Sequence, residues 1–198
     1  MSTNVDYPLH QVRAVFDDDT ITVYQAYCPE IAIPAIAANR FVPPFGLHRM
    51  SWIKPSFLWM MYRSGWATKP GQEHVLAITM TRKGFEEALS LAVLSHFDEN
   101  HYDSQQSWKA LLKDSPVRIQ WDPERTITGA PLPYRSLQIG LSGHILANYV
   151  DEWTVQIEDI TDFIQTLHPK VESDPSLLPQ EHPYPLPQVI SARIGANG

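Results

Sequence analysis

The chain has a single cysteine among its 198 residues, Cys28, and this scarcity excludes an intramolecular disulfide. A fold without disulfides suits a reducing compartment, so the sequence predicts a cytoplasmic protein. The first eight residues lack the basic start and the apolar run of a signal peptide. Charged residues interrupt the longest apolar stretches, and we therefore expect no membrane span and no membrane partner.

Familiar cofactor and metal motifs are also absent. The sequence contains no glycine-rich dinucleotide fingerprint, no P-loop, no HExxH and no CxxC motif. Its eight histidines are scattered without the spacing of metal ligands, so no metal is expected. Cys28 is followed by proline and has no evident histidine partner, which argues against a cysteine nucleophile.

Acidic residues are missing from one long internal stretch. No Asp or Glu occurs between Ile31 and Gln72, although five Lys and Arg residues do. Since the whole chain carries −7 and this stretch carries +5, the remainder carries −12. The overall acidity argues against indiscriminate binding of nucleic acid. It is compatible with a local pocket for a phosphate-bearing small molecule or an RNA end.

Within this stretch, residues 50–66 hold three of the six tryptophans and place Lys54 and Arg63 among large apolar side chains. We expect the segment to be mostly buried, with Trp59 in the core. Cations in apolar surroundings need an anion, because burying an unpaired charge is costly. The anion is either a distant carboxylate of the chain or the phosphate of a ligand.

The mixture of helical and strand patterns, without regular alternation, predicts an α+β fold. We expect one compact domain over residues 1–172, with a mixed or mainly antiparallel sheet and packed helices. Five prolines in residues 173–198 predict an extended C-terminal tail that is dispensable for folding. The alternative is that the apolar residues of this tail pack on the body.

Several individual elements follow from local patterns. Helices are predicted over 55–64 and 82–95, and a surface loop over 98–107. A buried strand is predicted over 74–81. Two further strands are predicted over 117–121 and 134–139, joined by the proline-bearing segment 122–133.

Arg49 and Lys54 are the first candidates for ligand binding. They lie in a loop and at the entrance of the predicted helix 55–64, where ligand-binding groups usually gather. The free N–H groups of a helix N-terminus also suit an anion. No glycine-rich phosphate loop accompanies these residues, so the pattern alone is a weak signal.

Arg63 is a third candidate, because it shares one side of the predicted helix with Trp59. A guanidinium beside aromatic rings offers a planar fork that suits phosphate or carboxylate. The alternative is a structural Arg63 that ties two elements together through Asp122 or Asp151.

Asp122 and Glu124 stand beside Trp121 at the end of a predicted strand. Two carboxylates at such a position are candidates for general acid or base catalysis. The alternative is a turn at Asp122 with Glu124 in solvent.

Three aromatic residues are candidates to stack on, or bond to, a base or ribose: Tyr24 and Tyr134 on predicted strands, and Trp59 on the predicted helix 55–64. Tyr134 shares a polar strand face with Ser136 and Gln138, and such a face can line a pocket. The alternatives are a core position for Tyr24 and an edge strand with one wet face for Tyr134.

Four motifs, at residues 17–27, 49–66, 120–125 and 131–141, carry a resemblance to a known family. In this order they resemble the family called domain of unknown function 4291, over roughly residues 12–171. The resemblance implies no established activity.

A fainter likeness is to the ADP-ribosyltransferase fold, an α+β unit that binds NAD between split sheets. That likeness implies NAD as a cofactor and a late glutamate, Glu124 or Glu152, in catalysis. The chain departs from this pattern, because residues 20–27 lack the expected early His or Arg and Arg13 is the only nearby substitute.

Together these residues suggest a group-transfer enzyme that acts on a nucleotide, NAD among the candidates, or on a nucleic-acid end. The alternative is a non-catalytic module that binds a phosphorylated ligand or a protein partner. A third alternative is a structural role, with the cations neutralised by internal carboxylates. The sequence carries no signal for an oligomeric state.

Overall fold

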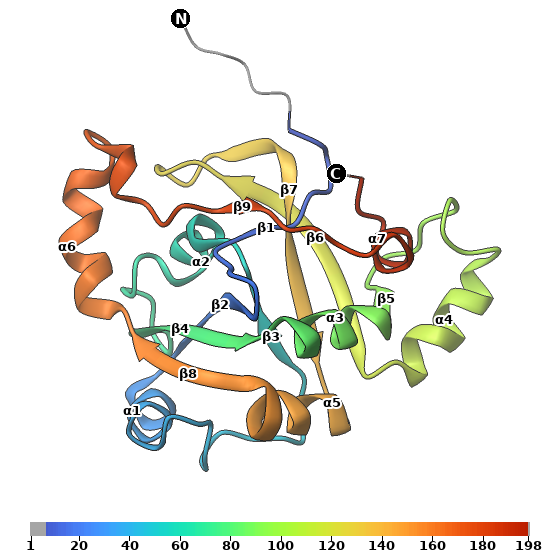
Figure 1. Ribbon diagram of the computed structural model, residues 1–198, viewed down its shortest axis with the longest axis horizontal. Coiled ribbons are helices and arrows are strands. Elements are labelled where there is room, and N and C mark those ends of the chain that lie inside the picture. The colour runs from blue at the N-terminus through green and yellow to red at the C-terminus, as the bar shows by residue number, and fades with distance from the viewer. Residues whose placement is uncertain (1–6, 198) are drawn as a thin grey trace, which may run out of the picture.

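Two main sheets form the framework of the protein in the computed structural model, which describes residues 7–197 (Figure 1). Residues 1–6 of the predicted domain, and residue 198, lie outside the described residues. The first sheet is antiparallel, with strands in the order β2 (Thr20–Tyr27), β4 (His74–Thr81) and β8 (Thr154–Asp159). The mixture of sheets and helices confirms the predicted α+β class.

The second sheet has four strands, and its buried face carries Ile53, Ile119 and Ile139, which lie opposite one another. Only the pair β5–β6 is parallel. The strand order is β3 (Ser51–Ile53), β7 (Pro131–Leu141), β6 (Val117–Arg125) and β5 (Ala92–Leu94).

The two sheets meet at Tyr24 and Lys54. The backbone N–H of Tyr24 donates to the Lys54 carbonyl at 2.7 Å, and the Lys54 N–H donates back at 3.3 Å. Helix α2 (Phe57–Ser64) follows at once and packs against both β2 and β6. Residues 50–66, the tryptophan-rich segment described above, therefore lie at the junction of the two sheets.

Local chemistry fixes both ends of α2. The Ser56 side chain accepts a hydrogen bond from the Trp59 N–H at 3.1 Å and caps the first turn. Gly65 ends the helix in the left-handed conformation, at φ 60°, which glycine adopts without steric cost. The helix starts two residues later than predicted, because Pro55 precedes the cap. Most of the segment is buried, as expected, but Arg63 is exposed.

Three other element predictions need correction. Helix α3 (Arg82–Ser90) is shorter than predicted, and part of its expected length forms β5. Helix α4 (Gln105–Asp114) begins inside the expected loop, at residues 105–107, and continues beyond it. None of its residues is fully buried, and the polar residues of its first turn, 105–107, have the composition of the preceding loop. Strands β6 and β7 extend through the proline-bearing segment and leave only 126–130 as a turn.

The remaining helices cover the first sheet and the ends of the molecule. Helix α1 packs on the strands β2, β4 and β8, and α6 lies at the left end of Figure 1. These elements are α1 (Pro29–Ala38), α5 (Gly143–Asn148), the π-helical turn Tyr149–Trp153 and α6 (Thr161–Val171).

The C-terminal residues do not form the predicted extended tail. Strand β9 (His182–Pro183) pairs with β1 (Arg13–Ala14), and helix α7 (Gln188–Ile194) packs on α3 and β5. Tyr184, at 2% exposure, belongs to the main hydrophobic core. The prolines hold this segment extended while its few apolar side chains reach inward, a pattern that has no regular period in the sequence.

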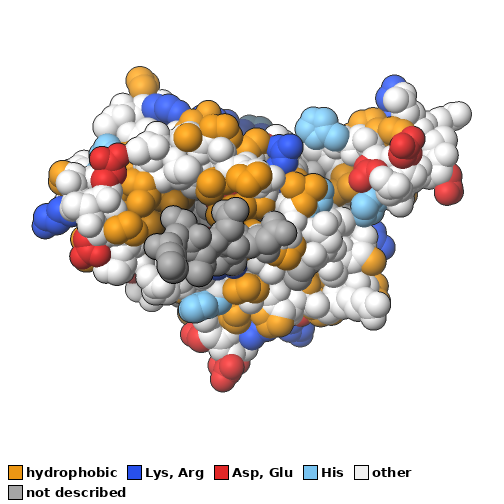
Figure 2. All heavy atoms as spheres, turned by 90° about the horizontal axis from the view of Figure 1, so that it is seen from above, with side chains coloured by type: hydrophobic (Ala, Val, Ile, Leu, Met, Phe, Trp, Pro, Cys, Tyr) orange, Lys and Arg blue, Asp and Glu red, His pale blue; other side chains and the backbone are white. Residues whose placement is uncertain are grey.

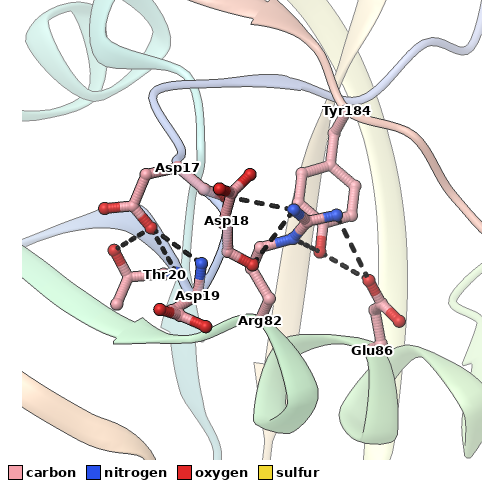
Figure 3. Close-up of polar contacts among 7 residues, drawn as sticks. All are labelled: Asp17, Asp18, Asp19, Thr20, Arg82, Glu86 and Tyr184. Carbon is pink, nitrogen blue, oxygen red and sulfur yellow. Dashed lines mark hydrogen bonds and ion pairs between the residues drawn. The ribbon is translucent and has the colours of Figure 1, made fainter.

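A polar network anchors this segment to the body (Figure 3). The Arg82 Nε donates to the Tyr184 hydroxyl at 3.0 Å, and that hydroxyl donates to the Glu86 carboxylate at 2.6 Å. Arg82 also donates to the backbone carbonyl of Asp17 at 3.1 Å. The network thus joins the turn before β2, helix α3 and the C-terminal segment.

Figure 2 looks down on the face that is uppermost in Figure 1. Hydrophobic side chains gather across the middle of this face, and acidic ones occur on the lobe at its right-hand end, where α4 lies. Among the described residues, no helix has both the length and the apolar character to cross a membrane.

Candidate functional site

A cleft of about 410 Å³ opens where the two sheets meet. Three elements bring cations to it: the loop before β3 supplies Arg49, the β3–α2 junction supplies Lys54, and the last turn of α2 supplies Arg63. None of its lining residues within the described range is acidic. We call it the cationic cleft, and the lining residues that matter below are Gln25, Tyr27, Arg49, Trp52, Lys54 and Arg63.

Lys54 has the most unusual environment in the cationic cleft. The residue is 5% exposed, and its Nζ lies 5.0 Å from the centre of the Trp59 ring. Burial, with the charge of Arg63 as a second cause, lowers the pKa of Lys54 to about 7, and the charge of Asp122 opposes this shift. A large share of the molecules therefore carries an uncharged amine near neutral pH.

Arg49 and Arg63 are exposed at the rim. Neither forms an ion pair with any residue of the described range 7–197. The alternative that Arg63 is tied to Asp151 is not found, because Asp151 pairs with Arg40 at 3.2 Å. Both guanidinium groups therefore keep their hydrogen-bond donors for solvent or a ligand.

One wall of the cationic cleft is held by a buried polar network around Gln25. Its amide nitrogen donates to the Tyr27 hydroxyl at 2.7 Å and to the Ser51 hydroxyl at 2.9 Å. Its amide oxygen accepts from the Tyr149 hydroxyl at 2.9 Å. Because the amide is satisfied on both sides, this wall is rigid.

Asp122 does not line the cationic cleft. Its carboxylate accepts hydrogen bonds from the side chains of Gln120, at 2.9 Å, and Gln138, at 3.1 Å. It is nevertheless close enough to raise the pKa of Lys54 against the effect of burial. Asp122 therefore acts on the cationic cleft through its charge.

Glu124 and Tyr134 lie in a different cleft, of about 450 Å³, together with Glu181. We call it the carboxyl cleft. The Glu181 carboxylate accepts a hydrogen bond from the Phe57 N–H at 2.7 Å and so caps the first turn of α2 from outside the helix. Arg13 lines the same cleft and donates to the Glu181 carbonyl at 3.0 Å.

Burial dominates the titration of the carboxyl cleft. It raises the pKa of Glu181 to about 8, opposed by the Phe57 N–H and reinforced by the charge of Glu124. Burial also raises the pKa of Glu124, which is 7% exposed, and that of Tyr134, to about 12. Glu181 as a whole is half-buried, but its carboxyl group is directed at the helix end.

The two remaining candidates are core residues. Tyr24 is 3% exposed, packs edge-on against Phe57 and lines neither cleft. Trp59 is 8% exposed, and its ring lies against the Lys54 amine. The indole Nε1 of Trp59 is buried and has no hydrogen-bond partner among the described residues.

The predicted site thus divides into two parts. The structure brings Arg49, Lys54 and Arg63 together and places Glu124 and Tyr134 apart from them. Sequence reasoning missed Glu181, which has no neighbouring motif and is recognised only by its contact with α2. Within residues 7–197, no cluster of three or more His, Cys, Asp or Glu side chains has an arrangement suited to a metal ion.

Comparison with known families supplies the classification. The family model described as Domain of unknown function (DUF4291) matches residues 11–184. The chain belongs to the DUF4291 family. The match includes Arg49, Lys54 and Arg63 of the cationic cleft and Glu124, Tyr134 and Glu181 of the carboxyl cleft, and it ends at Tyr184, before helix α7. A search of curated proteins finds no match to the chain.

Proposed function

We propose that this DUF4291 protein is a group-transfer enzyme that acts on a nucleotide, with NAD among the candidates, or on a phosphate-bearing nucleic-acid end. The observation that carries the proposal is the convergence of Arg49, Lys54 and Arg63 on one cleft without an acidic lining residue. In a chain of net charge −7, such a concentration of positive charge attracts anions locally.

Phosphate is the anion that suits these groups best. Arg49 and Arg63 each present a planar fork that matches two phosphate oxygens, and neither has an internal partner in the described range. Tyr27 and Trp52 line the same cleft and offer rings for a base or ribose. A ligand with both a phosphate and an aromatic base would use both kinds of group.

We assign Asp122 as the acid or base candidate, because its charge acts on Lys54. Glu124 would be the other acid or base candidate, and Tyr134 would contact the base or ribose. Both would act from the carboxyl cleft, on the far side of the first turn of α2. The meeting of two sheets at Lys54 is compatible with the faint likeness to ADP-ribosyltransferases, and NAD remains a candidate for that reason. We propose a cytoplasmic setting, since the chain has only one cysteine.

A non-catalytic module that binds a phosphorylated ligand or a protein partner is the second candidate. The absence of carboxylates from the described lining of the cationic cleft favours it, because no acid or base would touch the bound anion directly. A structural role for all three cations is disfavoured by the two exposed, unpaired arginines.

Calorimetric titration with ATP, NAD and a short 5′-phosphorylated RNA tests the proposal. We expect binding that weakens between about 50 and about 200 mM salt. Arg49→Ala and Arg63→Ala should each weaken it about tenfold or more, the effect of losing a charged hydrogen bond. Arg193→Ala, an exposed arginine on α7, is the matched control and should change nothing.

If Arg49→Ala and Arg63→Ala bind the ligands as tightly as Arg193→Ala does, the two rim arginines do not hold the ligand. Turnover of a bound nucleotide, followed by chromatography, separates the enzyme from the binding module. Absence of binding by all three ligands would overturn the enzyme and leave only a module for a protein partner.

A further inference from the structure

The Lys54 amine is the buried titratable group whose position is least explained by stability. Two backbone hydrogen bonds to Tyr24 hold the residue at the junction of the sheets. Its side chain is 5% exposed and runs to the wall of the cationic cleft. The geometry therefore directs one fixed amine into the cleft.

This amine has no partner of the kind that a structural lysine needs. Among residues 7–197, Lys54 forms no ion pair, and its Nζ is not one of the fully buried atoms that lack a partner, so the amine reaches the open space of the cationic cleft. The Nζ lies 5.0 Å from the centre of the Trp59 ring, and the Nε1 of that ring is buried without an acceptor among the described residues. A lysine that is 5% exposed, opens into a cleft and has no carboxylate partner is not explained by a structural ion pair, because burying an unpaired amine costs free energy.

The surroundings also keep the amine reactive. Arg63 on α2 and Arg49 on the preceding loop are positive, and Asp122 on β6 is the negative group that acts on Lys54. Desolvation beside another cation is the recognised way to obtain a lysine whose lone pair is free at neutral pH. A pKa of about 7 agrees with this arrangement.

We propose that Lys54 is a nucleophile that forms a covalent imine with the aldehyde carbon of a phosphate-bearing sugar. Arg49 and Arg63 hold the phosphate of this sugar, and the phosphate site therefore rests on the proposed function. The Nζ lone pair attacks the aldehyde carbon. The two hydrogens of the neutral amine and the carbonyl oxygen leave as one water molecule, and a C=N bond replaces the C=O bond.

An aldehyde fits the cationic cleft better than a phosphorus centre does. Transfer at phosphorus generally uses a divalent cation held by carboxylate oxygens, and the described lining offers no carboxylate. Imine formation needs only the amine and the carbonyl. A nucleotide sugar that has lost its base carries both features, an aldehyde in its open-chain form and a phosphate on the same sugar. It occurs free and as an abasic site in a nucleic acid.

Reductive trapping tests the assignment on the intact protein. Ribose 5-phosphate and cyanoborohydride are added, and the modified residue is identified by mass spectrometry among the six lysines of the chain. We expect Lys54 to be modified at least about tenfold faster than exposed Lys109, as for an activated lysine. Equal modification of all lysines would overturn the proposal, and this result does not depend on any variant folding.

Variants and a second sugar sharpen the test. Lys54→Met should abolish the fast modification, and Lys109→Met should leave it unchanged. Ribose without phosphate should react at least about tenfold more slowly than ribose 5-phosphate if the arginines hold the phosphate. Equal rates for the two sugars would overturn the phosphate part of the assignment and leave a nucleophilic lysine.

The outcomes separate this inference from the proposed function. Salt-dependent binding of ATP with no fast modification of Lys54 would overturn the nucleophile and keep the phosphate site. An oligonucleotide with one abasic site forms the second arm. Faster trapping of that strand than of free ribose 5-phosphate supports a nucleic-acid source of the aldehyde, and slower trapping supports a free sugar phosphate.

Discussion

The cationic cleft and the carboxyl cleft lie on two sides of the first turn of α2 and differ in the sign of the groups that they bury. One contains Lys54 beside two arginines, and the other contains Glu124 and Glu181. Burial is the main cause of the pKa shift in both. It lowers the pKa of the amine and raises the pKa of the carboxyl groups, because each loses hydration of its charged form.

The comparison shows how one short segment can prepare two opposite kinds of chemistry. In the cationic cleft the uncharged form is an amine with a free lone pair, which is a nucleophile. In the carboxyl cleft the uncharged form is an acid that can donate a proton near neutral pH. Both depend on residues 54–57, which supply Lys54 to one side and the capped Phe57 N–H to the other.

Removal of the C-terminal segment should have the largest effect on stability, and it also removes Glu181 from the carboxyl cleft. A chain that ends at Ser173 lacks Glu181, Tyr184 and the core residues of α7. Each buried apolar residue contributes about 2–5 kcal/mol, and a whole domain has only about 5–15 kcal/mol of stability. We expect the shortened chain to lose its cooperative thermal unfolding transition, as followed by tryptophan fluorescence.

Two point substitutions serve as controls for the truncation. Ile194→Ala, at a fully buried position, should destabilise by about 2–5 kcal/mol. Val189→Ala, at a position 78% exposed on the same helix, should change the stability by less than about 0.5 kcal/mol. An unchanged melting midpoint for the shortened chain would restore the prediction of a dispensable tail.

Trp59→Ala should have the next largest effect, because Trp59 supports the floor of the cationic cleft. We expect a loss of about 3–5 kcal/mol in urea unfolding, the usual range for a buried aromatic residue. Trp59→Phe keeps a ring and removes an indole N–H without a partner, so its loss should be much smaller. Equal losses for both variants would show that the ring itself does not provide the support.

The smallest expected effect is a pair of opposite pH dependences. The pKa of Lys54 in the folded protein, about 7, lies below its usual value of 10.5. Burial of the charged amine therefore destabilises the folded state in full below about pH 7, and this effect disappears above about pH 10.5. Lys54→Met should therefore stabilise more at about pH 5 than at about pH 9.

For Glu181 the sign reverses. Its folded pKa, about 8, exceeds its usual value of 4.5, so the destabilising charge is absent below pH 4.5 and complete above about pH 8. Glu181→Gln keeps an oxygen for the Phe57 N–H and should stabilise more at about pH 9 than at about pH 5.

Melting temperatures of both variants at the two pH values decide the comparison, with about 2–4 °C expected per kcal/mol. Lys109→Met and Glu99→Gln, at exposed positions, are the matched controls and should show no such trend. The same pH trend in both cleft variants would refute the view that the two clefts bury groups of opposite sign.

Particular elements show which parts of the fold can be predicted from the sequence. Strand β4 has the bounds that its apolar pattern predicts, and α2 differs only by the position of its cap. Helix α4 was missed because its first turn, 105–107, is polar and has the composition of the preceding loop. The C-terminal helix was missed because prolines surround it and its buried residues, Ile190 and Ile194, are few.

The sequence by itself determined the α+β class, the family, the burial of residues 50–66 and the choice of Arg49, Lys54 and Arg63 as a group. These follow from local patterning and from the absence of acidic residues over one stretch, which are properties of neighbours along the chain. Only the tertiary structure decided that Glu124 lies in a separate cleft and that Glu181 joins it. Pairing of β9 with β1 brings Glu181 to α2 over a long separation in sequence, and no local propensity encodes such a contact.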